Sequence, residues 1–147
     1  MIGYTKLEKS STHANSTRPG FIIAIILFAI LVIFVPKIAY FLRSANEQAT
    51  RRRLQAMRSA LTLYNAETGS YPENLTPMMA PGNKYLQGTL RVYTTDHGYL
   101  SHLNYSSAID PQADSGSWGY VNAGSQMGTV WIQCTHTDLR GTAWTMY

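Results

Sequence analysis

The side chains best suited to chemistry lie in the second half of this 147-residue chain. Asp110 and Asp114 fall in the segment Ile-Asp-Pro-Gln-Ala-Asp-Ser-Gly, and carboxylates are among the oxygen donors that Ca²⁺ prefers. That ion takes roughly six to eight oxygen ligands, whereas this segment supplies only the two carboxylates of Asp110 and Asp114. Asp110 and Asp114 are therefore calcium candidates, with turn formation by Asp-Pro and Asp-Ser-Gly as the favoured interpretation.

The histidines and the cysteine form no recognisable metal motif. His97 and His102 lie in a segment without periodicity, and their spacing is poor for two ligands on a regular element. Cys134 and His136 would share one face of a strand, but no third ligand is nearby in the sequence. We therefore expect surface histidines and a buried Cys134, which as the single cysteine forms no intramolecular disulfide.

The sequence also carries no catalytic motif. It lacks Gly-x-Ser-x-Gly, His-Glu-x-x-His, a paired-cysteine motif and a glycine-rich phosphate loop between a strand and a helix. We therefore predict no catalytic residues, no cofactor other than calcium, and a function other than catalysis.

Charge is distributed unevenly along the chain. The net charge is +4 although only 14% of the residues are charged, below the roughly 25% typical of soluble domains. A basic cluster beside a membrane span favours anionic lipid headgroups over nucleic acid as its partner, and a solvated helix face is the alternative. The cluster follows the main apolar segment and consists of Lys37, Arg43, Arg51, Arg52, Arg53 and Arg58.

The main apolar segment begins at Phe21, and residues 21–35 contain no polar side chain. Extended to Leu42 it is about 22 residues long, which at about 1.5 Å per residue spans a bilayer core of about 30 Å. A cleaved signal sequence has a shorter apolar core and an Ala-x-Ala-like site, which residues 39–41 do not supply. We predict residues 1–20 as a leader, disordered or removed, and residues 21–42 as a transmembrane segment.

Beyond this segment the apolar pattern becomes one-sided. Apolar residues recur at steps of three and four, which predicts an amphipathic helix over residues 43–68 that continues the first helix. Pro36 bends such a helix rather than ending it, whereas Thr68-Gly69 and Pro72 end it. The stripe consists of Leu42, Ala45, Ala49, Leu54, Met57, Leu61 and Tyr64, of which the last four are predicted to dock the sheet.

Residues 69–147 are predicted to form a loop followed by a small antiparallel sheet. Alternation predicts strands over residues 118–122 and 130–136 and a short closing strand over 142–147, whereas residues 97–117 show no clear period. In the favoured interpretation the tryptophans pack this thin sheet on the helix, and in the alternative they expose a binding face. These residues are Trp118, Trp131 and Trp144.

This order of elements resembles the type IV pilins and the pseudopilins of type II secretion systems. The resemblance is carried by Phe-Val-Pro-Lys-Ile at residues 34–38, by the helix 51–64 and by Gly-Ser-Tyr-Pro at residues 69–72. It implies an α+β fold in which a long N-terminal helix packs on a small antiparallel sheet, and it implies calcium in a late loop. It further implies an anchor in the bacterial inner membrane, a periplasmic C-terminal domain, and a place in a filament after assembly.

The same resemblance implies processing and partners. A prepilin peptidase would cut between Gly20 and Phe21, and Phe21 would then be methylated. Other partners would be pilin or pseudopilin subunits and an inner-membrane assembly platform, with no nucleic acid. The helix surface implied in assembly consists of Phe21, Ile25, Phe28, Val32 and Val35.

Two features depart from the family pattern. Ile25 stands where the family has a glutamate, and Pro36 lies closer to Phe21 than the family's proline lies to its phenylalanine. A carboxylate in hydrocarbon is costly unless it is paired. The resemblance implies that family members pair this glutamate with the N-terminal amine of a neighbouring subunit during assembly. With Ile25 the chain has neither the cost nor that pairing. Because some tip subunits of the family also lack this acid, the resemblance implies a minor, tip-located or accessory subunit of a type II secretion pseudopilus or a type IV pilus.

Other interpretations stay open at this point. The main alternative is a monomeric single-pass membrane-tethered binding domain that does not polymerise, and an enzyme is a more distant one. Asn-x-Ser/Thr triplets at Asn15, Asn74 and Asn104 are also compatible with a glycosylated single-pass protein.

Overall fold

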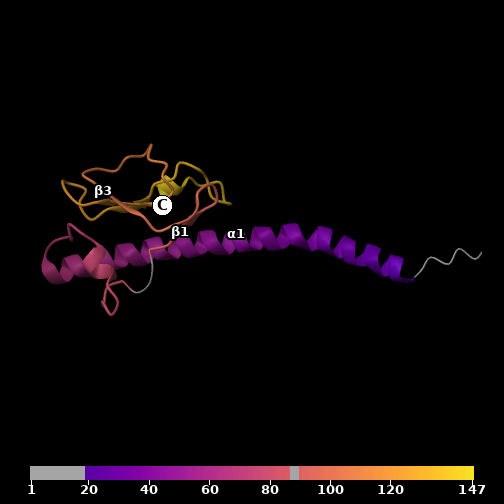
Figure 1. Cartoon of the computed structure of the whole chain (residues 1–147). Coiled ribbons are helices and arrows are strands. Elements are labelled where there is room, and N and C mark those ends of the chain that lie inside the picture. The colour runs from indigo at the N-terminus through magenta and orange to yellow at the C-terminus, as the bar shows by residue number, and fades with distance from the viewer. Residues whose placement is uncertain (1–18, 87–89) are drawn as a thin grey trace, which may run out of the picture. The chain divides into compact units, whose positions relative to one another are not determined.

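A computed structural model describes residues 19–86 and 90–147 of the chain. It confirms the predicted α+β class, because one long helix is followed by two small sheets (Figure 1). The chain divides into two compact units, Met1–Ile38 and Ala39–Tyr147. Most of the predicted leader lies outside the described residues. The elements are the helix α1 (Pro19–Thr68), the 3₁₀ helices η1 (Thr76–Met79) and η2 (Trp144–Met146), and the strands β1 (Val92–Thr94), β2 (Gly98–Leu100), β3 (Leu103–Ser106), β4 (Trp118–Val121) and β5 (Val130–Ile132).

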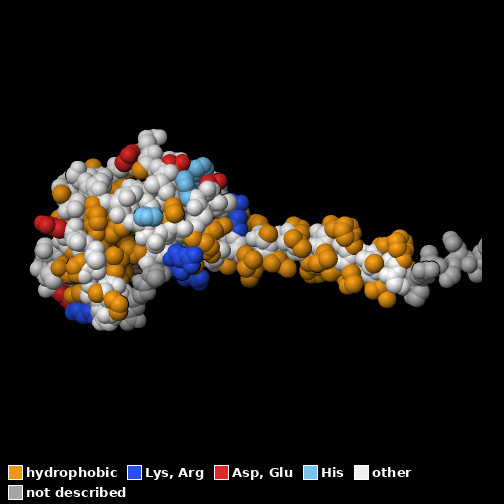
Figure 2. All heavy atoms as spheres, viewed as in Figure 1, with side chains coloured by type: hydrophobic (Ala, Val, Ile, Leu, Met, Phe, Trp, Pro, Cys, Tyr) orange, Lys and Arg blue, Asp and Glu red, His pale blue; other side chains and the backbone are white. Residues whose placement is uncertain are grey.

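The first unit is described from the start of α1. Every side chain from Phe21 to Ile38 is exposed, and Figure 2 shows hydrophobic side chains along the visible face of this stretch. α1 continues through Pro36 without interruption. By length and composition the helix is apolar enough to cross a membrane, a property that signal sequences share.

α1 ends at the glycine that the sequence predicts. Gly69 has a φ of 81°, and its N–H donates to the carbonyl of Asn65 at 2.8 Å. Side chains are strained in this left-handed region, so glycine closes the helix at little cost. Shortly afterwards the ring of Tyr71 lies against Gly128, where an added Cβ would come within 2.5 Å of the ring. The Gly-Ser-Tyr-Pro segment is thereby held beside the turn that precedes β5.

The strands form two sheets, whose strands lie beside the C-terminal part of α1 (Figure 1). β1 and β2 pair antiparallel, with Val92 opposite Leu100. β4 is the centre of the three-stranded sheet, antiparallel to β5 and parallel to β3. This sheet is therefore mixed, whereas the sequence predicted antiparallel pairing. Parallel neighbours need a long connection, which the segment between β3 and β4 supplies.

Several local predictions differ from the structure. β2 and β3 lie in residues 97–117, where the sequence predicts no strand; both are short, at three and four residues. β5 ends at Ile132 rather than at residue 136. Residues 142–147 contain η2 instead of a closing strand, since Trp144 turns inward and is fully buried.

The core of the second unit lies between one face of α1 and the three-stranded sheet. Leu54, Met57 and Leu61 are at most 2% exposed, and Tyr64 packs against their cluster with partial burial. All three tryptophans are at most 3% exposed. Trp118 and Trp144 belong to the core cluster with α1, as predicted, whereas Trp131 is buried outside that cluster, with its ring against Gly119. The sheet contributes Trp118, Tyr120, Val130 and Ile132 to this core.

The buried stripe on α1 follows a different phase before Leu54. Leu42 and Ala45 are exposed, so the predicted stripe is wrong at these positions. Glu47 and Thr50 are fully buried instead. Residues 47, 50, 54, 57 and 61 keep the steps of three and four, but the first two are polar and so do not belong to an apolar pattern.

Candidate functional site

The residues predicted for assembly all lie on the exposed apolar part of α1. Each of the five side chains is more than half exposed, and they belong to a surface that is apolar on every side. Such a surface is normally covered by lipid or by other apolar helices. Gly20, at the predicted cut, is exposed with open space around its Cα. The five residues are Phe21, Ile25, Phe28, Val32 and Val35.

The contact between α1 and the strands has an apolar part, which we call the apolar seam. On the helix it consists of Leu54, Met57 and Leu61, and on the sheet of Trp118, Tyr120, Val130 and Ile132. Tyr120 also ties the sheet to the segment after α1, because its hydroxyl donates to the carbonyl of Pro72 at 2.6 Å. Burial raises the pKa of Tyr120 to about 12, so the hydroxyl keeps its proton and remains a donor at neutral pH.

A second part of the contact is polar, and the sequence did not predict it. The fully buried Glu47 carboxylate accepts hydrogen bonds from Arg43 Nε at 3.3 Å, from Thr95 Oγ1 at 2.8 Å and from the Leu139 N–H at 3.0 Å. Three donors satisfy a charge whose burial would otherwise be costly.

Thr50 and Arg51 complete what we call the polar seam, which is Glu47, Thr50 and Arg51 with their partners. The Thr50 hydroxyl donates to the carbonyl of Tyr93 at 3.0 Å and accepts from the Tyr93 N–H at 2.8 Å. Arg51 pairs with the buried carboxylate of Asp138. The polar seam thus joins α1 to β1 and to the segment after β5.

The carboxyl group of Asp138 is ionised in this environment. Burial acts to raise its pKa, but hydrogen bonds from the Tyr147 hydroxyl and from the N–H groups of Thr142 and Arg140, with the charge of Arg51, outweigh burial and lower the pKa. The carboxylate therefore holds the segment 138–147 against α1.

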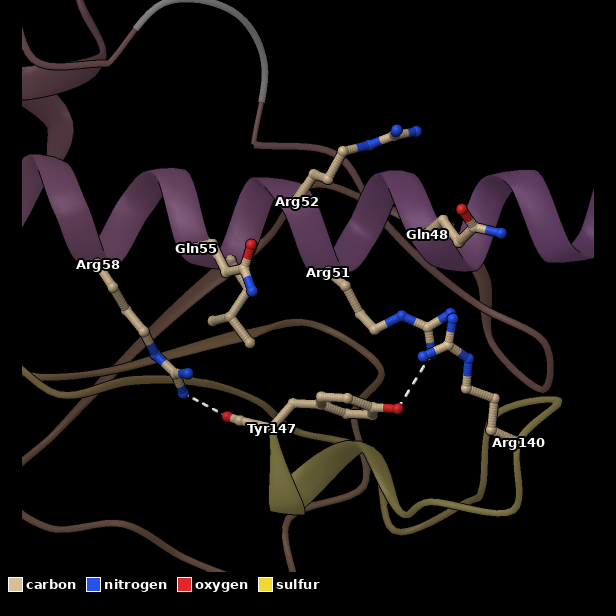
Figure 3. A pocket seen from close by; sticks show the side chains of 8 residues that line it. Gln48, Arg51, Arg52, Gln55, Arg58, Arg140 and Tyr147 are labelled. Carbon is tan, nitrogen blue, oxygen red and sulfur yellow. Dashed lines mark hydrogen bonds between the residues drawn. The ribbon is translucent and has the colours of Figure 1, made fainter.

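A pocket of about 360 Å³ lies beside the polar seam, and arginines dominate its lining (Figure 3). Arg58 donates to the carbonyl of Val130 at 3.0 Å and to the carbonyl of Tyr147. Within residues 19–86 and 90–147, no acidic side chain forms an ion pair with Arg52, Arg58 or Arg140. The lining can therefore accept an anionic group such as a carboxylate or a phosphate. It consists of Gln48, Arg51, Arg52, Leu54, Gln55, Arg58, Arg140 and Tyr147.

The basic cluster is too long to contact a membrane surface throughout its length. Arg58 lies about 24 Å along the helix beyond Leu42, at about 1.5 Å per residue. This distance exceeds the Debye length of about 8 Å at physiological ionic strength. If residues 21–42 span a bilayer, Lys37 and Arg43 are the cluster members that can contact headgroups, whereas Arg58 cannot.

The structure brings together four metal-ligating side chains from three loops. His97 lies in the turn between β1 and β2, Asp114 lies between β3 and β4, and Cys134 and His136 follow β5. One donor atom of each side chain lies within 4.8 Å of the donor atoms of all the others. We call this group the four-donor cluster.

Asp114 is the centre of the four-donor cluster. Its Oδ1 lies 3.1 Å from His97 Nε2 and 3.3 Å from His136 Nδ1. The same oxygen accepts a hydrogen bond from the Thr135 N–H at 2.9 Å, which is the main cause that lowers the pKa of Asp114. Cys134 Sγ lies 3.7 Å from His136 Nδ1. Figure 2 shows histidine and acidic side chains close together at the surface of this unit.

Cys134 is the buried member of the cluster. Burial raises the pKa of its thiol, while the His136 N–H and the Thr94 hydroxyl act in the opposite direction. A bound cation would favour the thiolate, because a metal ion removes the proton from a coordinating thiol.

The remaining predicted ligands lie outside this cluster. The Asp110 carboxylate accepts a hydrogen bond from the Gln112 N–H at 2.9 Å and so stabilises its own turn. His102 is exposed. Asp114 faces two imidazoles, which are not the donors that calcium prefers, and calcium at Asp110 and Asp114 stays a prediction.

Comparison of the chain with protein families, with curated proteins and with solved structures finds no match.

Sequence reasoning missed two groups of residues. The polar seam could have been found by continuing the steps of three and four from Leu54 back to Thr50 and Glu47, whatever the residue type. The four-donor cluster had a weaker signal in Cys134-x-His136. Its other ligands depend on how the loops fold together, which spacing along the chain does not show.

Proposed function

We propose that this chain is a structural, pilin-like subunit that is held in a membrane by residues 21–42 and assembles through the same helix. The observation that carries the proposal is that the two parts of α1 have different surroundings. Up to Leu42 the helix exposes apolar side chains on every side, and from Glu47 onward it buries one face against the sheets. A helix of this kind joins a folded domain to lipid or to other apolar helices.

The proposed setting is the bacterial inner membrane, with residues 69–147 in the periplasm. Proposed partners are other pilin or pseudopilin subunits, an assembly platform, and a prepilin peptidase acting between Gly20 and Phe21. The role is structural rather than catalytic. The fold is compatible with this class, since a long apolar N-terminal helix packs on a small β-sheet.

The assembly surface supports a minor or accessory role rather than that of the main subunit. Lipid tails are as apolar as leucine, so moving a helix from lipid into a filament gains little hydrophobic free energy and depends on close packing. Ile25 adds no charged pairing to this step. Incorporation would therefore depend on subunits that supply stronger contacts.

Crosslinking from the helix in living cells tests the proposal. A photoreactive residue replaces Phe28 in the full chain, which is produced in its native host, and crosslinked products are identified in membranes and in sheared filaments. We expect adducts with other pilin-like subunits. The matched control places the same group at Leu63, an exposed apolar residue of α1 outside the apolar segment, and should give few such adducts.

The mature N-terminus provides an independent measurement. Mass spectrometry that finds a methylated Phe21 at the start of the chain would support assembly. Release of the chain from membranes by alkaline carbonate would contradict the anchor itself.

A second candidate is the monomeric tethered domain, which the arginine-lined pocket favours because it offers a place for an anionic ligand. Adducts from Phe28 with lipid alone, together with an uncut N-terminus, would select this candidate.

A further inference from the structure

We propose that His97, Asp114, Cys134 and His136 form a binding site for a zinc ion in the second unit. The proposal goes beyond the structural role above and does not depend on it, because all four residues belong to the folded unit Ala39–Tyr147.

The spacing of the donor atoms fits a tetrahedral ion. Zinc binds histidine nitrogen and carboxylate oxygen at about 2.0–2.2 Å and cysteine sulfur at about 2.3 Å, so neighbouring donors of a tetrahedral site lie about 3.3–3.8 Å apart. The distances from Asp114 Oδ1 to His97 Nε2 and to His136 Nδ1 are 3.1 and 3.3 Å. Cys134 Sγ lies 3.7 Å from His136 Nδ1. The widest separation in the group, 4.8 Å, needs to shorten by only about 1 Å.

The types of donor select the metal. Two imidazoles, a thiolate and a carboxylate form a mixed nitrogen, sulfur and oxygen set, which zinc accepts in tetrahedral sites. Calcium prefers six to eight oxygens, and magnesium prefers an octahedron of oxygens. Four protein ligands also match the closed coordination of a structural zinc site rather than the open position of a catalytic one.

Surrounding residues hold the ligands before any metal binds. The Thr135 N–H positions Asp114 by its hydrogen bond of 2.9 Å. Gly116, with a φ of 69°, passes so close to His97 that an added Cβ would lie 2.3 Å from the histidine Cβ. The Gly116 N–H also donates to the carbonyl of Gln133 at 2.6 Å. The loop that carries Asp114 is thus fixed both to His97 and to the segment that carries Cys134.

A buried hydroxyl on β1 also lacks a partner. Thr94 Oγ1 is fully buried and has no hydrogen-bond partner among the residues that the structure describes. Metal ligands are commonly held by hydrogen bonds from outer residues, a role that a buried hydroxyl without a partner could take.

The ion would crosslink three loops that are far apart in the sequence. Because the chain has a single cysteine, it has no disulfide to do this. A zinc ion held by these loops would stabilise the folded unit in the way that structural zinc stabilises other small domains.

The test uses the full chain in detergent, purified without a histidine tag and stripped with a chelator. After equilibration with Zn²⁺ and removal of unbound metal, we expect one zinc per chain by mass spectrometry of the metal. At a free Zn²⁺ concentration of about 100 times Kd we expect the melting temperature to rise by roughly 5–10 °C. Co²⁺ in place of Zn²⁺ should give the visible absorption of a tetrahedral ion together with a thiolate-to-metal band.

Variants separate this site from adventitious binding. His136→Gln and His97→Gln remove ligands and should weaken zinc binding by at least the roughly 10–100-fold that loss of an outer partner costs. His136 is exposed and His97 is partly buried, and neither belongs to the core cluster. The matched control is His102→Gln, an exposed histidine outside the cluster, which should bind zinc as the wild type does. Cys134→Ser should remove the thiolate band while the chain still melts cooperatively.

Three results would overturn the proposal. They are less than about 0.2 zinc per chain after washing, equal loss of zinc in His102→Gln and His136→Gln, and a cobalt spectrum without the thiolate band.

Discussion

The apolar seam and the polar seam join the same helix to the same folded unit by different physics. Along the apolar seam Leu54, Met57 and Leu61 are buried. Their stabilisation is roughly proportional to the apolar area removed from water and has no preferred direction. Along the polar seam Glu47 and Thr50 are equally buried, but each is held by donors and acceptors at defined distances. Along this face of α1, burial therefore follows position on the helix rather than hydrophobicity.

The largest expected effect comes from a charge placed in the apolar seam. Leu61→Asp removes a buried side chain and introduces a buried carboxylate without a partner, which should cost about 5 kcal/mol or more. Thermal unfolding of the full chain in detergent, followed by fluorescence of the buried tryptophans, measures this cost. Leu63→Asp is the matched control, because Leu63 is exposed two residues away on the same helix. Equal losses in the two variants would show that the seam does not hold the sheet.

The next effect comes from removing the central acceptor of the polar seam. Glu47→Ala leaves the Thr95 hydroxyl, the Leu139 N–H and the Arg43 guanidinium without their carboxylate, which should cost about 2–4 kcal/mol. Denaturant unfolding measures the change. Gln48→Ala, at the exposed neighbouring position, should stay within about 0.5 kcal/mol of the wild type. A Glu47→Ala variant as stable as the control would refute a stabilising polar seam.

A smaller effect is expected at Thr50. Thr50→Val keeps the shape of the side chain but removes both hydrogen bonds to Tyr93, which should cost about 1–2 kcal/mol. Thr62→Val is the control, since the exposed Thr62 hydroxyl bonds only to Arg58 O in its own helix, and little change is expected there. Hydrogen exchange at the Tyr93 amide adds a local measurement, because that N–H loses its acceptor in Thr50→Val alone.

The smallest expected effect is a dependence of stability on acid. The pKa of Asp138 is lower in the folded chain than its ordinary value, so its contribution is fully present above the unfolded pKa and is lost as pH falls through the folded pKa. The melting temperature should therefore fall on acidification below about pH 4. Asp138→Asn should reduce the slope of melting temperature against pH in this range.

Other carboxyl groups also make the melting temperature depend on pH. The pKa values of Glu67 and Asp114 are also lowered, so the Asp138→Asn variant should retain the part of the slope that they cause. A slope identical to that of the wild type would mean that Asp138 does not couple folding to pH.

Much of the helix was predictable from the sequence, because its signals are local. The apolar segment from Phe21, the continuation through Pro36 and the end at Gly69 depend on residues next to one another. The strands β4 and β5 were also predicted, although β5 is shorter than its alternation suggested. β3 escaped prediction because its parallel partner β4 lies beyond a long connection.

The candidate site was predictable only where a pattern repeats. Leu54, Met57 and Leu61 follow helical spacing, but Glu47 breaks the hydrophobic pattern because its charge is satisfied by Thr95 and Leu139, which are distant in sequence. The four-donor cluster depends on three separate loops, so its ligands become neighbours only after the sheets form.

The burial of Glu47 also limits how α1 can slide along the sheets. Steps of three and four repeat every seven residues, so a shift of about 10.5 Å along the helix would bring Leu61 to the place of Leu54. At the apolar seam it would also bring Tyr64 to the place of Met57 and the polar Thr68 to the place of Leu61. It would further bring Leu54 to the place of Glu47 and leave the Thr95 hydroxyl and the Leu139 N–H facing a leucine. The buried Glu47 carboxylate and the Thr50 hydroxyl therefore help to fix one position of α1 along the sheets.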